Sequence, residues 1–152
     1  MSKVKIFAKS IAFHVIIGAI VGWIISSYID YNSLQKPFLS PPSIAFPIVW
    51  TILYILMGVS YGILKNNENV TGRIKLIYYV QLAVNALWSI FFFLLKWRLF
   101  SAVWIVLLAI LVVIMVFEFC KLSKAAGILQ IPYLVWVIFA SYLNFAIYFL
   151  NR

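Results

Sequence analysis

The chain has 152 residues, of which 66% are hydrophobic and only 10% are charged, and its formal net charge is +9. Soluble domains are about half apolar and about one quarter charged, so this composition excludes a soluble globular domain. Clustered basic residues would suggest nucleic-acid binding in a soluble protein. Here they lie at the ends of apolar runs, where such residues orient membrane helices. The composition therefore predicts an integral membrane protein that binds no nucleic acid.

Five apolar runs divide the chain, and each is long enough for one membrane helix. A helix needs about 20 apolar residues to cross the hydrocarbon core of a bilayer. The runs cover residues 11–29, 44–64, 74–95, 100–119 and 129–150. They are too long and unbroken for barrel strands, which alternate over about ten residues. The sequence predicts one all-α domain over residues 1–152, a bundle of five transmembrane helices.

The first run follows three lysines, as the apolar part of a secretory signal peptide would. It continues to Ile29 without a small-residue cleavage site, so we expect a retained first helix. His14 lies in this run with no evident second ligand or partner, and Cys120 is the one cysteine. Metal centres need several clustered ligands, so we predict no metal site and no required cofactor.

Basic residues are unequally divided between the two ends of the predicted bundle. With five spans the termini lie on opposite sides. One side collects Lys3, Lys5, Lys9, Lys65, Arg73, Lys75, Lys121 and Lys124, and the other collects Lys36, Lys96, Arg98 and Arg152. In a bacterial cell membrane this difference favours a cytoplasmic N-terminus and an external loop over residues 30–43.

Two glycine pairs at four-residue spacing lie in the first two runs. Gly18 and Gly22 form one pair, and Gly58 and Gly62 form the other. Small residues at this spacing permit close approach of membrane helices. The pattern predicts packing within the bundle, with a dimer interface as the alternative.

The second run begins with a stiff turn, Pro41-Pro42, and then becomes an apolar helix. Trp50 and Tyr54 lie four residues apart, which places an indole and a phenol on one helical face. No residue between Pro41 and Gly58 is charged. The segment cannot act as an acid, base or nucleophile, but it is suited to form the wall of an aromatic pocket.

Polar residues on the third run form a stripe that faces the bundle. Gln81, Asn85 and Ser89 share one helical face at four-residue spacing. Unpaired amides are costly in hydrocarbon, so this face is expected to point inward, either as hydrogen bonds between helices or as ligand anchors.

A second stripe lies on the fifth run, where Trp136, Ala140 and Asn144 have the same spacing. Counting 1.5 Å per residue from the helix ends places Trp50, Ser89 and Asn144 at similar depths below the 30–43 loop, with Trp136 nearer the middle of the membrane. We therefore predict a pocket there for a flat, hydrophobic ligand held by aromatic walls and a few amides.

The residue types exclude most enzyme chemistry. A single histidine cannot supply both the base and the partners of a Ser-His-acid site. Active transport usually leaves an ionisable group inside the membrane, and none lies near the centre of any predicted span. Binding without turnover is the favoured class.

Four segments, in order, resemble the tryptophan-rich sensory protein/translocator protein family (TspO/MBR), also called the peripheral benzodiazepine receptor family. They are Lys36-Pro37-x-x-x-Pro41-Pro42, Phe46-Pro47-x-Val49-Trp50-Thr51-x-Leu53-Tyr54-x-x-Met57-Gly58, Gln81-Leu82-x-x-Asn85-x-x-Trp88-Ser89 and Pro132-Tyr133-Leu134-x-Trp136-x-x-Phe139-Ala140-x-x-Leu143-Asn144. The resemblance covers nearly the whole chain.

The resemblance implies a five-helix bundle, commonly a homodimer, with a ligand pocket capped by the loop between the first two helices. Members bind porphyrins such as protoporphyrin IX, and animal members bind cholesterol and benzodiazepine-type drugs. The positions matching the family's pocket are Tyr31, Pro41, Trp50, Tyr54, Asn85, Trp136 and Ala140. Some bacterial relatives support light-dependent porphyrin breakdown, with the indoles matching Trp50 and Trp136 implicated.

Two departures from the family pattern bear on the ligand. Leu39 occupies a loop position where many relatives have tryptophan, so we expect the loop to lose one stacking group. Phe145 replaces a tyrosine of the animal cholesterol motif, which disfavours cholesterol. The leading hypothesis is a porphyrin-binding or sensing protein. A porphyrin-degrading photo-oxidase and a passive porphyrin, lipid or sterol transporter are the alternatives.

Overall fold

The computed structural model describes residues 2–152, and every regular element in that range is helical. The long helices are α1 (Lys3–Ile25), α2 (Ala45–Asn66), α3 (Gly72–Ser89), α4 (Arg98–Leu122) and α6 (Ile131–Leu150). The short elements are η1 (Ser26–Tyr28), η2 (Tyr31–Ser33), the π-helical turn η3 (Ile90–Leu94) and α5 (Lys124–Ile128). The predicted all-α class is confirmed.

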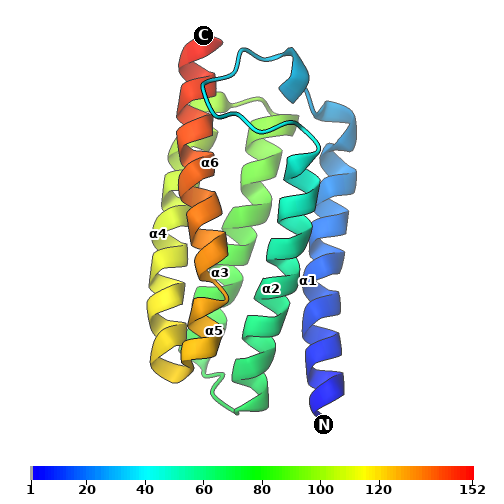
Figure 1. Cartoon of the computed structure of the whole chain (residues 1–152), viewed down its shortest axis with the longest axis vertical. Helices are drawn as coiled ribbons and strands as arrows, with labels where there is room; N and C mark the ends of the chain where they lie inside the picture. Colours follow the sequence, from blue (N-terminus) through cyan, green and yellow to red (C-terminus); the bar gives the residue numbers. More distant parts are fainter. Residues whose placement is uncertain (1) are drawn as a thin grey trace.

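Five segments are long and apolar enough to cross a membrane, as the composition predicted. They run alternately up and down, with α5 and α6 together forming the fifth (Figure 1). α1 packs against α2 and α3, α4 packs against α3, α5 and α6, and α5 packs against α2. The chain ends lie at opposite ends of the bundle, and the 30–43 loop lies at the C-terminal end (Figure 1).

The predicted helix boundaries fail most clearly at the start of α1. This helix begins at Lys3, about two turns before the predicted position. The Ser2 side chain accepts a hydrogen bond from the Lys5 backbone N–H, which caps the first turn. Hydropathy finds the part of a helix that is apolar, whereas a helix can extend beyond that part when its lysines remain exposed.

The fifth span is broken near its start, which the sequence analysis did not predict. α5 ends at Ile128 and α6 begins at Ile131, with Pro132 in the first turn of α6. Proline has no N–H to donate, and its ring clashes with the carbonyl one turn earlier, so a continuous helix is disfavoured there. α5 packs against the end of α4, where Gly127 lies directly on Cys120.

Glycines allow α1 and α2 to approach closely. A Cβ atom at Gly58 would lie 2.6 Å from the Cα of Ile11, and one at Gly62 would lie 2.8 Å from the Phe7 ring. A Cβ atom at Gly18 would lie 2.7 Å from the nearest atom of the Tyr54 ring. Packing within the bundle is therefore the role of these three glycines.

His14 is buried and joins α1 to α3, so the expectation that it has no partner is wrong. Its Nδ1 lies 2.5 Å from the Ser10 carbonyl, which can only accept, so Nδ1 carries the proton. Nε2 then accepts a hydrogen bond from the Tyr78 hydroxyl. The Tyr78 ring stacks on Tyr61 of α2 with ring centroids 4.3 Å apart.

The Gly58→Ala substitution is expected to destabilise the protein by about 1–3 kcal/mol, because the added methyl must push the α1 backbone away from α2. Gly22→Ala is the matched control, since nothing lies within 4 Å of its Cβ position. That variant should be neutral or gain up to about 1 kcal/mol of helix propensity. Thermal unfolding in one detergent measures both, and equal unfolding temperatures would contradict the packing role.

Candidate functional site: an aromatic cavity between three helices

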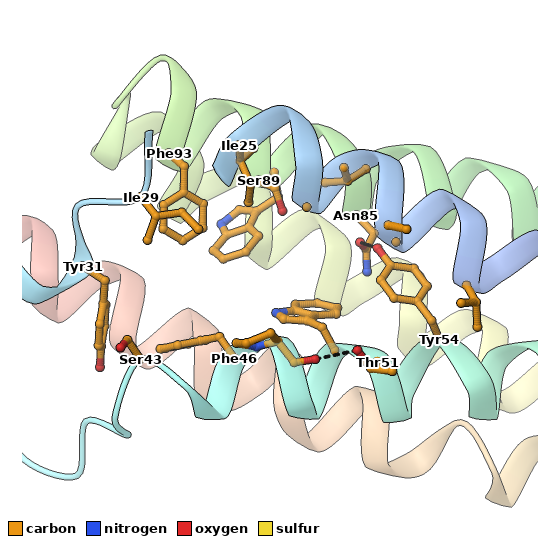
Figure 2. Close-up of a pocket in the computed structure, with 18 residues that line it drawn as sticks. Ile25, Ile29, Tyr31, Ser43, Phe46, Thr51, Tyr54, Asn85, Ser89 and Phe93 are labelled. Atoms are coloured by element: carbon orange, nitrogen blue, oxygen red, sulfur yellow. Dashed lines mark hydrogen bonds between the residues drawn. The ribbon is translucent and has the colours of Figure 1, made fainter. Parts of the chain in front are cut away.

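A cavity of about 340 Å³ lies between α1, α2 and α3 in the half of the bundle nearest the 30–43 loop. It is lined by Val15, Gly18, Ala19, Val21, Gly22, Ile25, Ile29, Tyr31, Ser43, Phe46, Pro47, Trp50, Thr51, Tyr54, Asn85, Trp88, Ser89 and Phe93. Tyr54 and Asn85 lie at one end of it, and Tyr31 and Ser43 lie at the other (Figure 2). Its volume falls within the range of small-molecule sites, about 300–1,000 Å³.

The cavity begins where the close packing of α1 on α2 ends. Ile11 and Phe7 lie directly against the glycines of α2, and the Tyr54 ring fills the space beside Gly18. One turn further along α1, Gly22 has no neighbour within 4 Å of its Cβ position, and it lines the cavity. The Gly18–Tyr54 contact is therefore the floor, and the missing side chain at Gly22 leaves space above it.

A chain of hydrogen bonds fixes the polar groups at the floor. The Tyr54 hydroxyl donates to Asn85 Oδ1 at 2.7 Å, and Asn85 Nδ2 donates to the Tyr133 hydroxyl at 2.7 Å. Tyr133 in turn donates to Gln81 Oε1 at 2.9 Å. All four residues are buried. The chain ties α2, α3 and α6 together and holds Asn85 in one orientation.

Trp50 occupies the centre of the aromatic wall. Its ring centroid lies 6.0 Å from Tyr54 and 6.3 Å from Trp88, both of which line the cavity. Behind it, Trp136 packs edge-on at 6.5 Å and also contacts Phe46. The two indoles are thus in direct contact, with Trp50 facing the cavity and Trp136 forming a second layer.

The structure brings half of the predicted pocket residues to this cavity. Those that line it are Tyr31, Trp50, Tyr54, Asn85 and Ser89. Those that do not are Pro41, Gln81, Trp136, Ala140 and Asn144. The inward orientation predicted for the stripe on α3 is confirmed, because Gln81 and Asn85 are buried. The predicted wall from the fifth span is not formed, because α1 supplies that wall instead.

Each residue that does not line the cavity has another position. Gln81 lies behind Asn85 and accepts the last hydrogen bond in the row at the cavity floor, from Tyr133. The Pro41 carbonyl accepts a hydrogen bond from the Tyr31 hydroxyl. Ala140 and Asn144 line a small hollow of about 20 Å³, which shares Phe46 and Trp88 with the cavity.

Asn144 uses both ends of its amide in hydrogen bonds to α3 and to the start of α4. Its Oδ1 accepts from Trp88 Nε1 at 2.8 Å, and its Nδ2 donates to the Arg98 carbonyl at 3.1 Å and to Ser101 Oγ at 3.3 Å. These bonds explain why a buried amide lies on this face of α6.

Sequence reasoning missed the contribution of α1 and of Trp88 and Phe46. α1 has almost no polar residue on the cavity side, so no stripe marked it. The signal that could have found it was the glycine pair, since Gly18 permits contact and Gly22 leaves a gap. Trp88 stood in the quoted motif, next to Ser89.

The 30–43 loop is fastened to α6 by side chains. The Asn151 side chain exchanges two hydrogen bonds with the Gln35 backbone, at 2.9 and 2.8 Å. The Tyr142 hydroxyl donates to the Phe38 carbonyl at 2.8 Å. Lys36 Nζ donates to the carbonyls of Tyr31 and Leu34, each at 3.1 Å, which gives this motif lysine a structural role.

An ion cluster connects the same loop to the α3–α4 turn. The Asp30 carboxylate accepts from Lys96 Nζ at 3.1 Å and from Arg98 Nη2 at 2.7 Å. Burial by itself would raise the pKa of this carboxyl, but the hydrogen bonds and positive charges of the two basic residues outweigh it and lower the pKa. Asp30 is therefore held in its charged form.

The side chains that line the cavity are apolar, aromatic or neutral polar groups. Among the described residues that line it, none is Asp, Glu, Lys, Arg, His or Cys. Within residues 2–152, no three His, Cys, Asp or Glu side chains form a group that could hold a metal ion. Fold and site together define a helical membrane protein with an aromatic cavity for a hydrophobic small molecule.

Comparison with known proteins identifies the family. The TspO/MBR family model matches residues 10–150, and the chain belongs to that family. It is 44% identical over 126 residues to the tryptophan-rich protein TspO of Chlorobaculum tepidum, covering 80% of this chain and 78% of that protein. It is 43% identical over 122 residues to TspO of Archaeoglobus fulgidus, covering 80% and 79%. Over 122 residues it is 31% identical to the translocator protein of Sus scrofa, covering 78% and 72%.

The Asp30→Asn substitution should lower stability at neutral pH by about 1 kcal/mol, because it removes the shared partner of two cations in a partly exposed cluster. The lowered pKa means that the carboxylate stabilises the native protein above the ordinary value of 3.8, and that this contribution is lost as the pH falls through the native pKa. The unfolding temperatures of the two proteins should therefore converge in acid.

Glu68→Gln is the control for that measurement, because Glu68 is an exposed carboxyl in the turn at the opposite end of the bundle. Its unfolding temperature should follow that of the unaltered protein at every pH. A pH-independent difference between Asp30→Asn and the unaltered protein would contradict the assignment to charge.

Proposed function

We propose that the protein binds porphyrin-type tetrapyrroles of the protoporphyrin IX class, and similar flat hydrophobic molecules, as a membrane-embedded binding or sensing protein. The observation that carries the proposal is the cavity wall formed by Trp50, Tyr54 and Trp88, which presents ring faces and edges to an apolar space. Offset and edge-to-face contacts with such rings favour a planar aromatic ligand. The family match, and relatives named tryptophan-rich sensory protein and translocator protein, support this class of function.

The polar groups of the cavity limit how a ligand could be oriented. The Tyr54 hydroxyl and the Trp88 indole N–H already donate within the protein, and Asn85 Nδ2 gives one of its two N–H groups to Tyr133. Among the hydrogen bonds of residues 2–152, none uses the Trp50 indole N–H, so this donor is available to a ligand. We infer that Trp50 both stacks on the ligand and donates to an acceptor on it.

The ligand would enter and partly extend through the side of the bundle. Val15, Ala19 and Gly22 of α1 line the cavity and are exposed, as are Pro47 and Thr51 of α2. A macrocycle too large for the cavity would place one edge against Trp50. The rest of the macrocycle would lie between α1 and α2, toward the lipid.

The cellular setting is part of the same proposal. The eight-to-four division of basic residues supports a cytoplasmic N-terminus in a bacterial cell membrane, and the relatives include bacterial proteins.

The outer face of α4 is apolar along its length, which suits either lipid or a second copy, so we propose a homodimer. Mass measurement by light scattering in detergent tests the dimer.

The Gly22→Leu substitution should weaken protoporphyrin IX binding at least tenfold, because the new side chain fills the cavity without displacing a neighbour. Binding is followed by quenching of tryptophan fluorescence in detergent. Ala12→Leu is the matched control, since it adds the same group at an exposed position of α1 outside the cavity. Unchanged affinity in a folded Gly22→Leu protein, or no saturable quenching by the unaltered protein, would refute the proposal.

Light-dependent porphyrin oxidation is a second candidate function, favoured by the direct contact of Trp50 with Trp136. Two indoles in contact, one facing the ligand, are suited to hold a radical through which the illuminated macrocycle loses an electron, with O2 as the final oxidant. If this reaction occurs, illumination of the complex in oxygen gives a bilin-type absorbance. Trp50→Phe should abolish that product, and Trp136→Phe should slow its formation while leaving affinity within about threefold. Bleaching equal to that of free porphyrin would remove this candidate.

Passive transport is the less favoured alternative. The floor of the cavity is closed by the Gly18–Tyr54 contact and by the hydrogen bonds of Asn85. A ligand bound above it has no open path to the other end of the bundle. Flux of labelled porphyrin into proteoliposomes above the protein-free rate would favour transport over binding alone.

A further inference from the structure

The α3–α4 turn and the end of α6 meet at the C-terminal end of the bundle (Figure 1), and a second, open cavity lies between them. Its volume is about 360 Å³, and it is lined by Lys96, Trp97, Arg98, Leu99, Phe100, Tyr148, Asn151 and Arg152. In the described chain it shares no lining residue with the aromatic cavity. It is built from the α3–α4 turn, the start of α4 and the end of α6, so it lies where the spans meet the membrane surface.

The walls of this second cavity carry an excess of positive charge. Lys96, Arg98 and Arg152 all line it, and no acidic residue does so within residues 2–152. The nearest balancing charge is Asp30, which bonds both Lys96 and Arg98. Three basic side chains share one acidic side chain, and no ion pair involves Arg152 in the described structure.

Arg98 lines this cavity but keeps two of its donor atoms buried beneath the surface. Its side chain is 13% exposed, and its Nε and Nη1 atoms have no hydrogen-bond partner. The Oδ1 atom of Asp30 has no hydrogen-bond partner either. The guanidinium carbon lies 4.5 Å from the centre of the Phe92 ring, which fixes its plane. An arginine held in this way is suited to a phosphate or carboxylate oxygen.

The start of α4 adds to the positive electrostatic potential of this cavity. No side chain caps this 25-residue helix in the described structure, and its first turn contains no acidic residue. Leu99 and Phe100, whose backbone N–H groups belong to that first turn, line the cavity. The positive end of the helix dipole favours an anion here, in addition to the three basic side chains.

The surroundings indicate that the anion is attached to a lipid. Trp97 is 52% exposed and Tyr148 lies beside it on the cavity wall, a pairing typical of the membrane interface. Below the cavity, α4 exposes Phe100, Val103 and Ile110 in succession. An acyl chain could lie along this face while its headgroup occupies the cavity.

We propose that this cavity binds the phosphodiester group of an anionic phospholipid, such as phosphatidylglycerol, through Lys96, Arg98 and Arg152. The shared chemistry is a phosphate anion. A soluble phosphate ester is the other possible source of that group. The site is independent of the proposed function, because porphyrin binding uses a separate cavity.

The test counts bound lipid by native mass spectrometry of the full-length protein in detergent. It compares phosphatidylglycerol with phosphatidylcholine, and both with glycerol 3-phosphate as a soluble competitor. The variant is Lys96→Asn with Arg152→Gln, and Asn is chosen because Lys96 has a φ of 56°, which Asn tolerates. The matched control removes two charges at the opposite end, Lys3→Gln with Lys5→Gln.

Phosphatidylglycerol should bind the unaltered protein and the control variant, and phosphatidylcholine, whose phosphate charge is offset by its own choline cation, should bind both much more weakly. The double variant should bind phosphatidylglycerol about 10–30-fold more weakly, since each cation near an anionic lipid contributes about fivefold. Arg152→Gln alone, which leaves the Asp30 cluster intact, should lose about fivefold. Protoporphyrin IX quenching should be the same in all four proteins, which separates this test from the proposed function.

Three results would overturn the proposal. The first is equal phosphatidylglycerol affinity in the double variant and the unaltered protein. The second is an equal loss in the Lys3/Lys5 control, which would indicate a general charge effect. The third is competition by glycerol 3-phosphate at the same concentration as the lipid, which would assign the site to soluble phosphate esters.

Discussion

The close contact of α1 with α2 is the constraint on which the site depends. Gly58 and Gly62 bring α1 against the α2 backbone, and Gly18 accepts the ring of Tyr54. In a membrane, helices gain little from the hydrophobic effect, so such close van der Waals contacts largely determine how they associate. Because the contact is tight at one end and ends at Gly18, the space between the helices opens only above it. The packing that stabilises this pair also sets the depth of the ligand cavity.

The hydrogen bonds at the cavity floor show how the same residues serve structure and recognition. Asn85 lines the cavity, yet both ends of its amide are already bonded, to Tyr54 and Tyr133. A ligand therefore meets an amide held by two phenols and not a free one. Buried polar groups that are fully paired rigidify a core, whereas an unpaired one in hydrocarbon is costly. The cavity keeps its shape without ligand because these bonds are made within the protein, which suits a preformed binding site.

The sequence predicted the number of spans, the all-α class and the inward stripe on α3, because each follows from local pattern and bilayer thickness. It also predicted that the fifth span forms one wall of the cavity, whereas α1 forms that wall. The stripe of Trp136, Ala140 and Asn144 was interpreted as facing the ligand, but Asn144 bonds Trp88 and the start of α4, and Trp136 packs behind Trp50. Periodicity identifies the face that points into the bundle. It does not identify which helix that face meets, since this depends on how the five spans are arranged.

The 30–43 loop is held by more contacts than its sequence suggested, and this changes the meaning of Leu39. The sequence alone predicts that Leu39 removes one stacking group from the loop over the ligand. In the structure Leu39 has a φ of 70°, is 66% exposed and does not line the cavity. Tyr142 and Asn151 of the α6 end hold the neighbouring backbone at Phe38 and Gln35. A side chain at position 39 could reach the ligand only if these bonds broke and the loop moved. In this closed form, Tyr31 is the loop residue that faces the cavity, and its bond to the Pro41 carbonyl fixes the edge of the opening.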